Sequence, residues 1–335
     1  MEPEMLLLLN RTINLMEGLG YLWVVSTGLE LELWSELTLP KSLAQLIESH
    51  PTWDHVLLDH WLEQAYCLDL LDKKNQAYRT NKLGRALVAY REQGLAAMYQ
   101  EFITYWSPCF AALPELIRGN VTKENLQSGL ETELVSRASL ASEPFVLPLL
   151  KAKCQREKWQ NILDIGCGEG TCLVHLLTAF PELRGTGIEL NPVVAKRATQ
   201  AAQPFADRLR IVCGDALELD PTLGSYDVCL LNNNIYYFTP ERRLALLTRL
   251  KPLVKPGGRL GILSALRDSD YRARVFKTYI PQNLMSFFLA CHAGFDGLPT
   301  ETELQALLSQ AGFIELETIP LALRTSHYFF ARKPV

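Results

Sequence analysis

The sequence has no excess of basic residues and no long apolar run. It contains 33 lysines and arginines against 37 aspartates and glutamates, so its formal net charge is −4. This balance argues against nucleic acid or an anionic membrane as the main partner. The apolar run from Met5 to Leu9 ends at Asn10 and Arg11, and no basic segment precedes it. A membrane span needs about 20 apolar residues, so we expect neither a signal peptide nor a membrane helix there.

The eight cysteines are scattered along the chain and form no Cys-x-x-Cys pair. Three of them, Cys167, Cys213 and Cys229, lie in or beside segments that are predicted to be buried strands. Scattered cysteines of this kind are typical of reduced core thiols, so the sequence favours a cytoplasmic protein. No internal repeat or low-complexity segment is present.

The chain has enough apolar sequence to bury a sizeable core, with 48% apolar and 21% charged residues. Its length of 335 residues predicts about two domains. We expect an all-α first domain with a small hairpin over residues 1–90 and connecting helices over 91–150. Strands and helices should then alternate over 151–335.

Residues 1–90 are predicted to alternate short amphipathic helices with polar turns. In the segment 31–37, Leu31 and three further apolar residues share one face, and Pro40 stops the helix. Ser42 has Gln45 three residues later, which is the spacing of a capping box at the start of the next helix.

A longer helix over 54–71 and a strand–turn–strand pattern over 70–80 complete a winged-helix order. Such a domain first suggests a DNA-binding regulator, in which lysines and arginines of one helix contact phosphates. Residues 51–71 contain four acidic residues and no lysine or arginine. We therefore favour an oligomerisation module, and a ligand-sensing regulator is the rival hypothesis. His50, His55 and His60 are five apart, on different helix faces, and indicate surface or interface histidines rather than a metal site.

Residues 91–150 are predicted to be helical and rich in large aromatic side chains. Such a stripe usually belongs to a core or a subunit interface, and a substrate-pocket role for one or two members is the alternative. The stripe consists of Tyr99, Phe102, Tyr105, Trp106 and Phe110. The segments 136–137 and 142–145 lead into the first strand of the next domain and could contact a ligand there.

From residue 161 a strand–helix period predicts an α/β fold with a seven-stranded doubly wound sheet. The expected strands are 161–166, 185–189, 209–213, 226–232, 258–264, 313–319 and 326–332, the last two antiparallel. The expected helices are 171–180, 192–203, 240–251 and 301–311. A longer insertion separates the fifth strand from the last helix.

The segment from Asn161 to Gly170 organises this second half. An apolar strand breaks into a turn with glycines at 166, 168 and 170, and a helix follows. Glycine tolerates positive φ and leaves room for a ligand against the backbone. A doubly wound sheet builds its nucleotide site in this way, although a glycine-rich turn without a ligand is the alternative for the triplet alone.

Polar residues at the ends of the following strands favour a ligand site. Glu189 ends the second strand and can accept both hydroxyls of a ribose. Asp215 follows the third strand and could accept from an adenine amino group, and residues 232–234, all asparagine, end the fourth. Each could be an ordinary turn or cap residue, but together they line one crevice. No Lys-Ser/Thr pair follows the glycines, which disfavours a phosphate-binding P-loop.

Together these motifs resemble the series found in class I S-adenosylmethionine-dependent methyltransferases, which have a Rossmann-like sheet. The matching segments are 163–170, Glu189, 214–216 and 253–258, within a resemblance that covers 161–332. The segments 78–80, 106–119 and 303–313, with Gly84 and Leu87, resemble the small-molecule O-methyltransferases that carry a winged-helix dimerisation domain. The resemblance implies a homodimer that methylates a small molecule.

The resemblance also implies site residues. Asp164, Gly166 and Gly168 would hold the methionine part of S-adenosylmethionine, Glu189 the ribose, and Asp215 with Ala216 the adenine. The expected cofactor site comprises Asp164, Gly166, Cys167, Gly168, Glu189, Leu190, Asp215, Ala216, Asn232, Asn233 and Arg137. No metal ligand is assigned.

The sequence departs from the family after the fourth strand. Plant-type relatives carry a His-Asp pair there, the histidine being the general base, whereas Tyr236 and Tyr237 occupy those positions here. A phenol with a pKa near 10 is a poor base at neutral pH. One explanation makes His292 the base. The other is a nucleophile that is acidic by itself, such as the α-carbon of a keto acid. The segment 233–238 is similar to a branch with keto-acid C-methyltransferases, some of which use a metal held by histidines.

The insertion 266–298 is predicted to be a lid over the pocket. Its arginines would suit a carboxylate or other anion on the substrate. The residues concerned are Arg267, Arg272, Arg274, Tyr271, Phe276, Tyr279, Phe287 and Phe288. The sequence thus predicts a methyltransferase for a small metabolite of secondary metabolism, with a hydroxyl acceptor slightly favoured over carbon.

Overall fold

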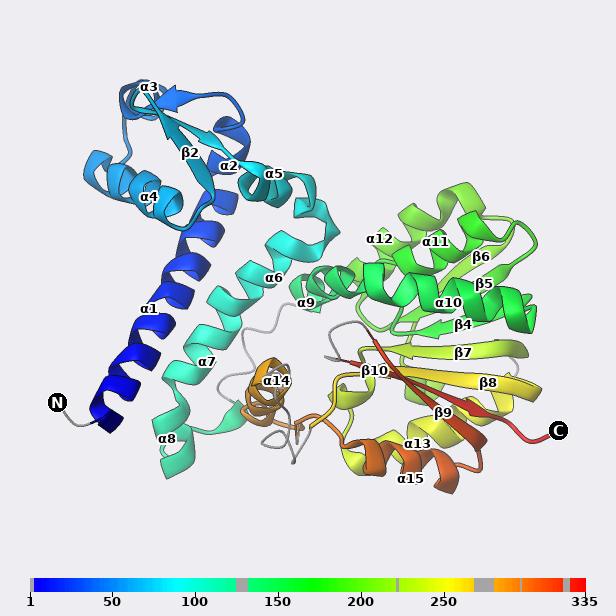
Figure 1. Ribbon diagram of the computed structural model, residues 1–335. Helices are drawn as coiled ribbons and strands as arrows, with labels where there is room; N and C mark the ends of the chain where they lie inside the picture. Colours follow the sequence, from blue (N-terminus) through cyan, green and yellow to red (C-terminus); the bar gives the residue numbers. More distant parts are fainter. Residues whose placement is uncertain (1–2, 125–131, 221–222, 268–279, 296, 322–325) are drawn as a thin grey trace. The chain divides into compact units, whose positions relative to one another are not determined.

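The computed structural model describes residues 3–124, 132–220, 223–267, 280–295, 297–321 and 326–335 (Figure 1). The chain divides into two compact units, Met1–Ile103 and Thr104–Val335. The three-part division expected from the sequence stays a prediction. Within the described residues, we find no helix that combines the length and the apolar character needed to cross a membrane.

The first unit begins with a long helix, which corrects the expectation of short helices throughout. Its helices are α1 (Pro3–Glu30), α2 (Leu33–Glu36), α3 (Leu43–Ser49), α4 (His55–Cys67), α5 (Lys82–Ala89) and α6 (Ala96–Glu101). The first 17 described residues of α1 are exposed or half-buried, so no core pattern marked its length in the sequence. Leu31, placed on the buried face from its spacing, is exposed because Glu32 takes a left-handed conformation between α1 and α2.

The core of the first unit forms around Trp34, which donates its indole N–H to the carbonyl oxygen of Val25 at 3.0 Å. Trp61 packs beside it with ring centroids 5.0 Å apart. The capping box of Ser42 and Gln45 is present, as expected. A three-stranded sheet of order β1 (Lys41–Ser42), β3 (Ala77–Thr80) and β2 (Leu71–Lys74) is antiparallel throughout. The helix–helix–hairpin order is therefore as expected.

The second unit is a seven-stranded sheet, which confirms the expected fold class. Its order is β6-β5-β4-β7-β8-β10-β9, in which β10 runs antiparallel to both of its neighbours and the first five strands are parallel. The strands are β4 (Asn161–Ile165), β5 (Arg184–Glu189), β6 (Leu209–Cys213), β7 (Tyr226–Asn232), β8 (Val254–Ser264), β9 (Ile314–Pro320) and β10 (His327–Arg332). The central strands are continuous apolar runs because both faces are covered.

Helices cover both faces of this sheet (Figure 1). On one face lie α10 (Glu143–Glu157), α11 (Thr171–Ala179) and α12 (Pro192–Ala202), and on the other α13 (Pro240–Leu250) and α15 (Glu301–Gln310). The remaining helices are α7 (Ser107–Ala111), α8 (Leu113–Arg118), α9 (Thr132–Ser139) and α14 (Ile280–Ala290).

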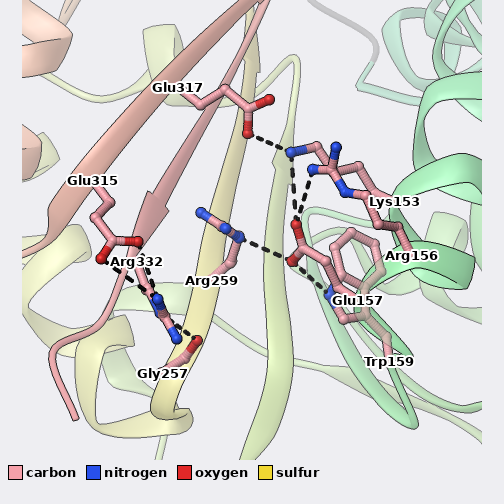
Figure 2. A network of polar contacts seen from close by, with 9 residues as sticks. All are labelled: Lys153, Arg156, Glu157, Trp159, Gly257, Arg259, Glu315, Glu317 and Arg332. Atoms are coloured by element: carbon pink, nitrogen blue, oxygen red, sulfur yellow. Dashed lines mark hydrogen bonds and ion pairs between the residues drawn. The ribbon is translucent and has the colours of Figure 1, made fainter.

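A network of ion pairs fastens α10 to the antiparallel side of the sheet (Figure 2). Glu157 accepts from Nε of Arg259 on β8 at 2.9 Å and lies 3.6 Å from the ammonium of Lys153. Lys153 is buried, pairs with Glu317 of β9 and lies over the ring of Phe330. Burial opposes ionisation of Glu157, but the neighbouring cations outweigh it and lower its pKa. The network holds the helix that leads into β4.

Candidate cofactor and acceptor site

The glycine turn lies between β4 and α11 and requires its glycines. Gly166, Gly168 and Gly170 have φ of 66°, 55° and 75°, a region that side chains with a Cβ rarely adopt. The amide of Cys167 donates to the carbonyl oxygen of Ile188 at 3.0 Å, which lays the turn against β5. The backbone N–H groups after β4 are thereby placed at the carboxyl edge of the sheet.

Glu189 is fixed by the backbone of this turn. One carboxylate oxygen accepts from the amide of Gly168 at 3.0 Å and the other from the amide of Asn191 at 2.9 Å. Each oxygen keeps a further lone pair. The carboxylate is therefore positioned at the end of β5 and can accept two more hydrogen bonds from a ligand such as a vicinal diol.

Asp164 is buried beneath the turn, with a relative exposure of 1%. Burial, together with repulsion from Glu143 and Glu189, raises its pKa to about 8. The amide of Asn232 opposes this shift by donating to Asp164 at 3.2 Å, and the hydroxyl of Tyr328 donates to Asn232 at 2.8 Å. The arrangement places more carboxylate charge in this region than the described residues neutralise, which suits a cationic ligand.

Glu143 adds to this acidic region from the first turn of α10. Its carboxylate accepts from the hydroxyl of Thr171. Burial raises its pKa, while Thr171 and a more distant His175 oppose the shift. The structure thus places Glu143 with the group predicted from the strand ends, as the position of segment 142–145 had suggested.

The residues predicted for an adenine group lie next to Glu189. The amide of Gly214 donates to the backbone carbonyl of Glu189 at 3.0 Å, which brings Asp215 to that end of the sheet. Asp215 accepts from the amide of Leu217 at 2.8 Å, so it is also the cap of a short 3₁₀ turn. Leu190 is an apolar side chain that is 65% exposed beside these groups, and an apolar surface of this kind suits the face of a flat base.

Helix α9 and the start of α10 form a cover segment, residues 133–143, against the same edge. Ser136 lies at the glycine turn, since its hydroxyl would be 2.8 Å from a Cβ placed on Gly168. Arg197 of α12 joins the two, pairing with Glu133 of α9 at 2.6 Å and with Glu169 of the turn at 3.5 Å. Arg137, also predicted for this site, is exposed on α9.

Two buried polar atoms at this edge have no hydrogen-bond partner among the described residues: the hydroxyl oxygen of Ser136 and the side-chain oxygen of Asn234. Both lie against the glycine turn, Asn234 through its amide, which donates to the carbonyl of Ile165. Asn233 has a φ of 54° and donates to Ser142 at 3.1 Å. Buried polar atoms normally have partners, so these two mark a place where a polar ligand belongs.

The three predicted catalytic residues meet in one aromatic cluster of the second unit. Tyr236 and Tyr237 have ring centroids 4.8 Å apart, and Tyr237 meets Phe295 edge to face at 5.7 Å. His292 lies 6.4 Å from the same Phe295 ring. Phe295 thus connects the turn after β7 to the end of α14, a link that spacing in the sequence could not reveal.

His292 is buried, and its Nδ1 lies 2.9 Å from the carbonyl oxygen of Phe288. A carbonyl only accepts, so we assign the ring proton to Nδ1, which leaves the lone pair of the neutral ring on Nε2. Burial lowers the pKa of His292, against the opposing effect of the Phe288 bond. A neutral histidine with a fixed tautomer can take a proton.

Aromatic residues of the connecting segment extend this cluster. Trp106 stacks on Phe288 of α14 with centroids 4.5 Å apart, and Phe110 lies 5.8 Å from Phe287. Tyr99 instead packs in the first unit, 6.4 Å from Tyr21. Of the predicted lid residues, Arg267 is exposed, and Arg272, Arg274, Tyr271, Phe276 and Tyr279 lie outside the described residues. The described chain holds no group of three or more His, Cys, Asp or Glu suited to a metal ion.

The comparisons agree with this geometry. Residues 162–258 match the family model of a methyltransferase domain. A tRNA1(Val) (adenine(37)-N6)-methyltransferase of Porphyromonas gingivalis is 33% identical over 126 residues, which cover 31% of this chain and 49% of that protein. Mitomycin biosynthesis 6-O-methyltransferase of Streptomyces lavendulae is 34% identical over 107 residues, which cover 32% and 30%. The chain thus spans about half or less of the length of these relatives.

A solved structure shares the fold over the whole chain. Human N-acetylserotonin methyltransferase in complex with S-adenosylmethionine superposes with a TM-score of 0.80 at 20% identity, covering 100% of this chain and 99% of that one. Residues 162–258 therefore match a methyltransferase domain, on a fold shared with a solved methyltransferase, as the resemblance to the class I, S-adenosylmethionine-dependent type implies. This confirms the resemblance seen in the sequence.

S-adenosylmethionine is the cofactor of this class, and the residues present fit it. The sulfonium and the ammonium of its methionine part are cationic, which suits the acidic region around Asp164. Its ribose diol matches the two fixed oxygens of Glu189. Its polar groups could supply the missing partners of Ser136 and Asn234. The role of each residue remains a prediction.

Proposed function

We propose that this protein transfers the methyl group of S-adenosylmethionine to a small-molecule acceptor, of the kind made in secondary metabolism. The acidic edge of the sheet at the glycine turn, with its two unpartnered polar atoms, carries the proposal, because it supports binding of this cofactor. When bound, the cofactor supplies a methyl group on a sulfonium as the electrophile. Asp164, Gly166, Cys167 and Gly168 would hold its methionine part, and Glu189, Leu190, Asp215 and Ala216 its adenosine.

The protein's own work in the reaction is alignment and proton transfer. An in-line displacement needs the nucleophile held behind the methyl group, and correct orientation contributes a large part of such a rate enhancement. The aromatic cluster supports this role, since flat rings that pack against one another form a rigid wall. His292 would take the proton of a hydroxyl acceptor through Nε2.

A hydroxyl acceptor is slightly favoured, and carbon is the second candidate. Tyr236 is 4% exposed and stands where plant-type relatives have the base. This observation favours an acceptor that needs no strong base at that position, such as the α-carbon of a keto acid, with or without a metal. Oxygen keeps the advantage because the buried, neutral His292 offers a base from the loop that follows α14.

Cofactor binding tests the proposal first. Glu189→Ala removes an acceptor of two ligand hydrogen bonds, and bonds to a charged group are each worth about 1.5–3 kcal/mol. We expect isothermal titration with S-adenosylhomocysteine to show binding to the intact protein and at least about tenfold weaker binding to this variant. Glu182→Ala, an exposed carboxylate on the same unit, is the matched control. No binding by the intact protein, or equal binding by Glu189→Ala, would overturn the proposal.

Turnover then separates the acceptor classes. The protein is incubated with methyl-labelled S-adenosylmethionine and phenols, enols, keto acids or total tRNA, and products are analysed by mass spectrometry. If oxygen is the acceptor, His292→Ala should lower kcat by about 10²–10⁴, with bound metal checked by elemental analysis. Unchanged turnover without bound metal removes His292 as the base and favours a carbon acid. Labelled tRNA alone would contradict a small-molecule acceptor.

We also propose a cytoplasmic homodimer that does not use nucleic acid. The eight free cysteines support a reducing compartment, and the net charge of −4 disfavours nucleic acid. Exposed apolar residues along α1 support self-association through the first unit. These are Met5, Leu6, Leu7, Leu8, Leu9, Ile13, Leu15, Met16, Leu19 and Trp23.

A further inference from the structure

Arg243 is a charged residue of α13 that is buried in the second unit, next to the turn that carries Tyr236 and Tyr237. Its relative exposure is 3%. Nε donates to the carbonyl oxygen of Ile235 at 3.2 Å, and Nη2 donates to that of Gly297 at 3.3 Å. Burying a guanidinium costs several kcal/mol unless its donors are used. Its neighbour Arg242 is exposed and lies over the ring of Phe238. The two adjacent arginines of α13 therefore differ in burial, and the burial is specific to Arg243.

The two carbonyls belong to the two sides of the aromatic cluster. Ile235 begins the turn that carries Tyr236 and Tyr237. Gly297 lies in the loop after α14, close in sequence to His292 and Phe295. A guanidinium holds two acceptors in a fixed fork geometry. Arg243 therefore joins the tyrosine turn to the loop that follows the histidine.

The loop after α14 is also hydrogen-bonded to α14. A change at the contact between Arg243 and the loop would therefore affect the position of α14. The hydroxyl of Ser286 on α14 accepts from the amide of Leu298 at 3.0 Å. Gly297 has a φ of 86°, and a Cβ there would lie 2.6 Å from the same hydroxyl. The loop is thus held against α14 at one point and against Arg243 at the next.

The rings between these two attachments are in direct contact. Tyr237 meets Phe295 at 5.7 Å, and Phe295 is 6.4 Å from His292. Any change in the distance between the tyrosine turn and the loop must move Phe295 relative to one of its neighbours. Packed side chains tolerate little such movement.

We propose that Arg243 is a positioning residue that fixes the distance between the tyrosine turn and His292, and so the placement of the proposed base. The effect of Arg243 on catalysis rests on the proposed function. Its effect on the position of His292 does not depend on that function. Arg243 acts through Tyr237, Phe295 and His292, at one end of the sheet, and leaves the cofactor residues of β4 and β5 in place.

Histidine titration by NMR tests whether Arg243 positions His292, and it needs no methyl acceptor. The chain has six histidines, and His292→Gln identifies the signal of His292. In the wild type, burial holds the pKa of His292 below its ordinary value. In Arg243→Met, with S-adenosylhomocysteine bound, we expect this pKa to move up toward the ordinary range as water reaches the ring. Arg242→Met, the exposed neighbour, should leave it unchanged.

A second variant guards against a folding defect. Arg243→Lys keeps the buried charge, but an ammonium is a point donor without the fork, so we expect a smaller shift of the His292 signal in a folded protein. Both variants should bind S-adenosylhomocysteine within about threefold of the wild type. An unshifted His292 in a folded Arg243→Lys and Arg243→Met pair would overturn the proposal. So would a loss of cofactor affinity that matches the change at His292.

Kinetics give the catalytic consequence once wild-type turnover is observed. With the acceptor found in the product screen, Arg243→Lys should lower kcat/KM for the acceptor by about tenfold, since small misplacements of reacting groups are costly. The KM for S-adenosylmethionine should stay unchanged. Equal losses for both substrates would indicate a general structural role. If the wild type yields no product, the proposed function fails while the NMR result still decides the role of Arg243.

Discussion

Asp164 shows how a single buried carboxylate connects the fold to the charge of its ligand. Burial and the neighbouring Glu143 and Glu189 raise its pKa to about 8. The folded protein therefore binds this proton more tightly than the unfolded chain. The stability that Asp164 contributes is present below pH 4 and is lost as the pH rises toward 8. A cationic ligand reverses the balance, because it favours the ionised carboxylate.

This carboxylate predicts that cofactor affinity depends on pH. If binding requires ionised Asp164, the affinity for S-adenosylhomocysteine should increase between pH 6 and pH 8, by up to about tenfold per unit. Isothermal titration at pH 6, 7 and 8 measures it. Asp164→Asn should bind more weakly at pH 8 and show a flatter profile. A wild-type affinity that is constant over this range contradicts a role for Asp164 in holding the cation.

Local motifs in the sequence predicted residues at the glycine turn and the strand ends, but not the partners that distant elements bring to them or to the aromatic cluster. The glycines and Glu189 carry a recognisable spacing because they belong to one strand–turn–helix unit and the next strand. Tyr328, Phe295 and Arg243 had no such signal, since they reach the site from distant elements. Such long-range contacts depend on the packed fold, which a spacing pattern does not describe.

At the scale of elements, the cover segment 133–143 meets the glycine turn through Arg197. Among the described residues, Arg197 forms ion pairs with both α9 and the turn. Its partners are Glu133 on α9 and Glu169 in the turn. Ser136 of the same segment lies against Gly168 of the turn. Since the cover segment precedes β4 and Arg197 lies far along the chain, the pairing adds a constraint that chain connectivity does not supply.

We expect Arg197→Gln to loosen the cover segment. A partly exposed ion pair contributes about 0.2–1 kcal/mol, so the affinity for S-adenosylhomocysteine should fall about two- to fivefold, with faster dissociation in stopped-flow measurements. Arg118→Gln, an exposed arginine paired with Glu115 on α8, serves as control and should behave as the wild type. Unchanged dissociation from Arg197→Gln means that the cover segment closes without this contact.

The observed boundaries of strands and helices agree with those expected from the sequence wherever burial imposes a periodic apolar pattern. The parallel strands agree with expectation within a few residues because their two covered faces demand apolar runs. Strand β8 begins at Val254, earlier than the expected 258, because its first residues still pair with β7, where the register shifts between Tyr226 and Val228. The length of helix α1 was missed because its exposed half has no core to impose a pattern.

At the scale of the whole molecule, the exposed half of α1 is the feature that a single chain does not explain. Monomeric proteins rarely expose contiguous apolar patches larger than a few hundred Å². Ten large apolar residues between positions 5 and 23 are each more than 40% exposed in the isolated chain. Their burial against a second copy would contribute roughly 25 cal/mol per Å² of apolar area, before the cost of association is subtracted.

Self-association through α1 makes a clear prediction about mass in solution. Light scattering after size exclusion should give twice the chain mass of 37.8 kDa for the wild type. The double variant Leu8→Glu with Ile13→Glu places two charges on the exposed face and should shift the protein toward monomer or lower its solubility, because burying unpaired carboxylates is costly. Ile117→Glu, an apolar residue on α8 that is 77% exposed, should leave the mass unchanged. A wild type of single-chain mass, with α1 intact by mass spectrometry, would mean that this helix serves another contact.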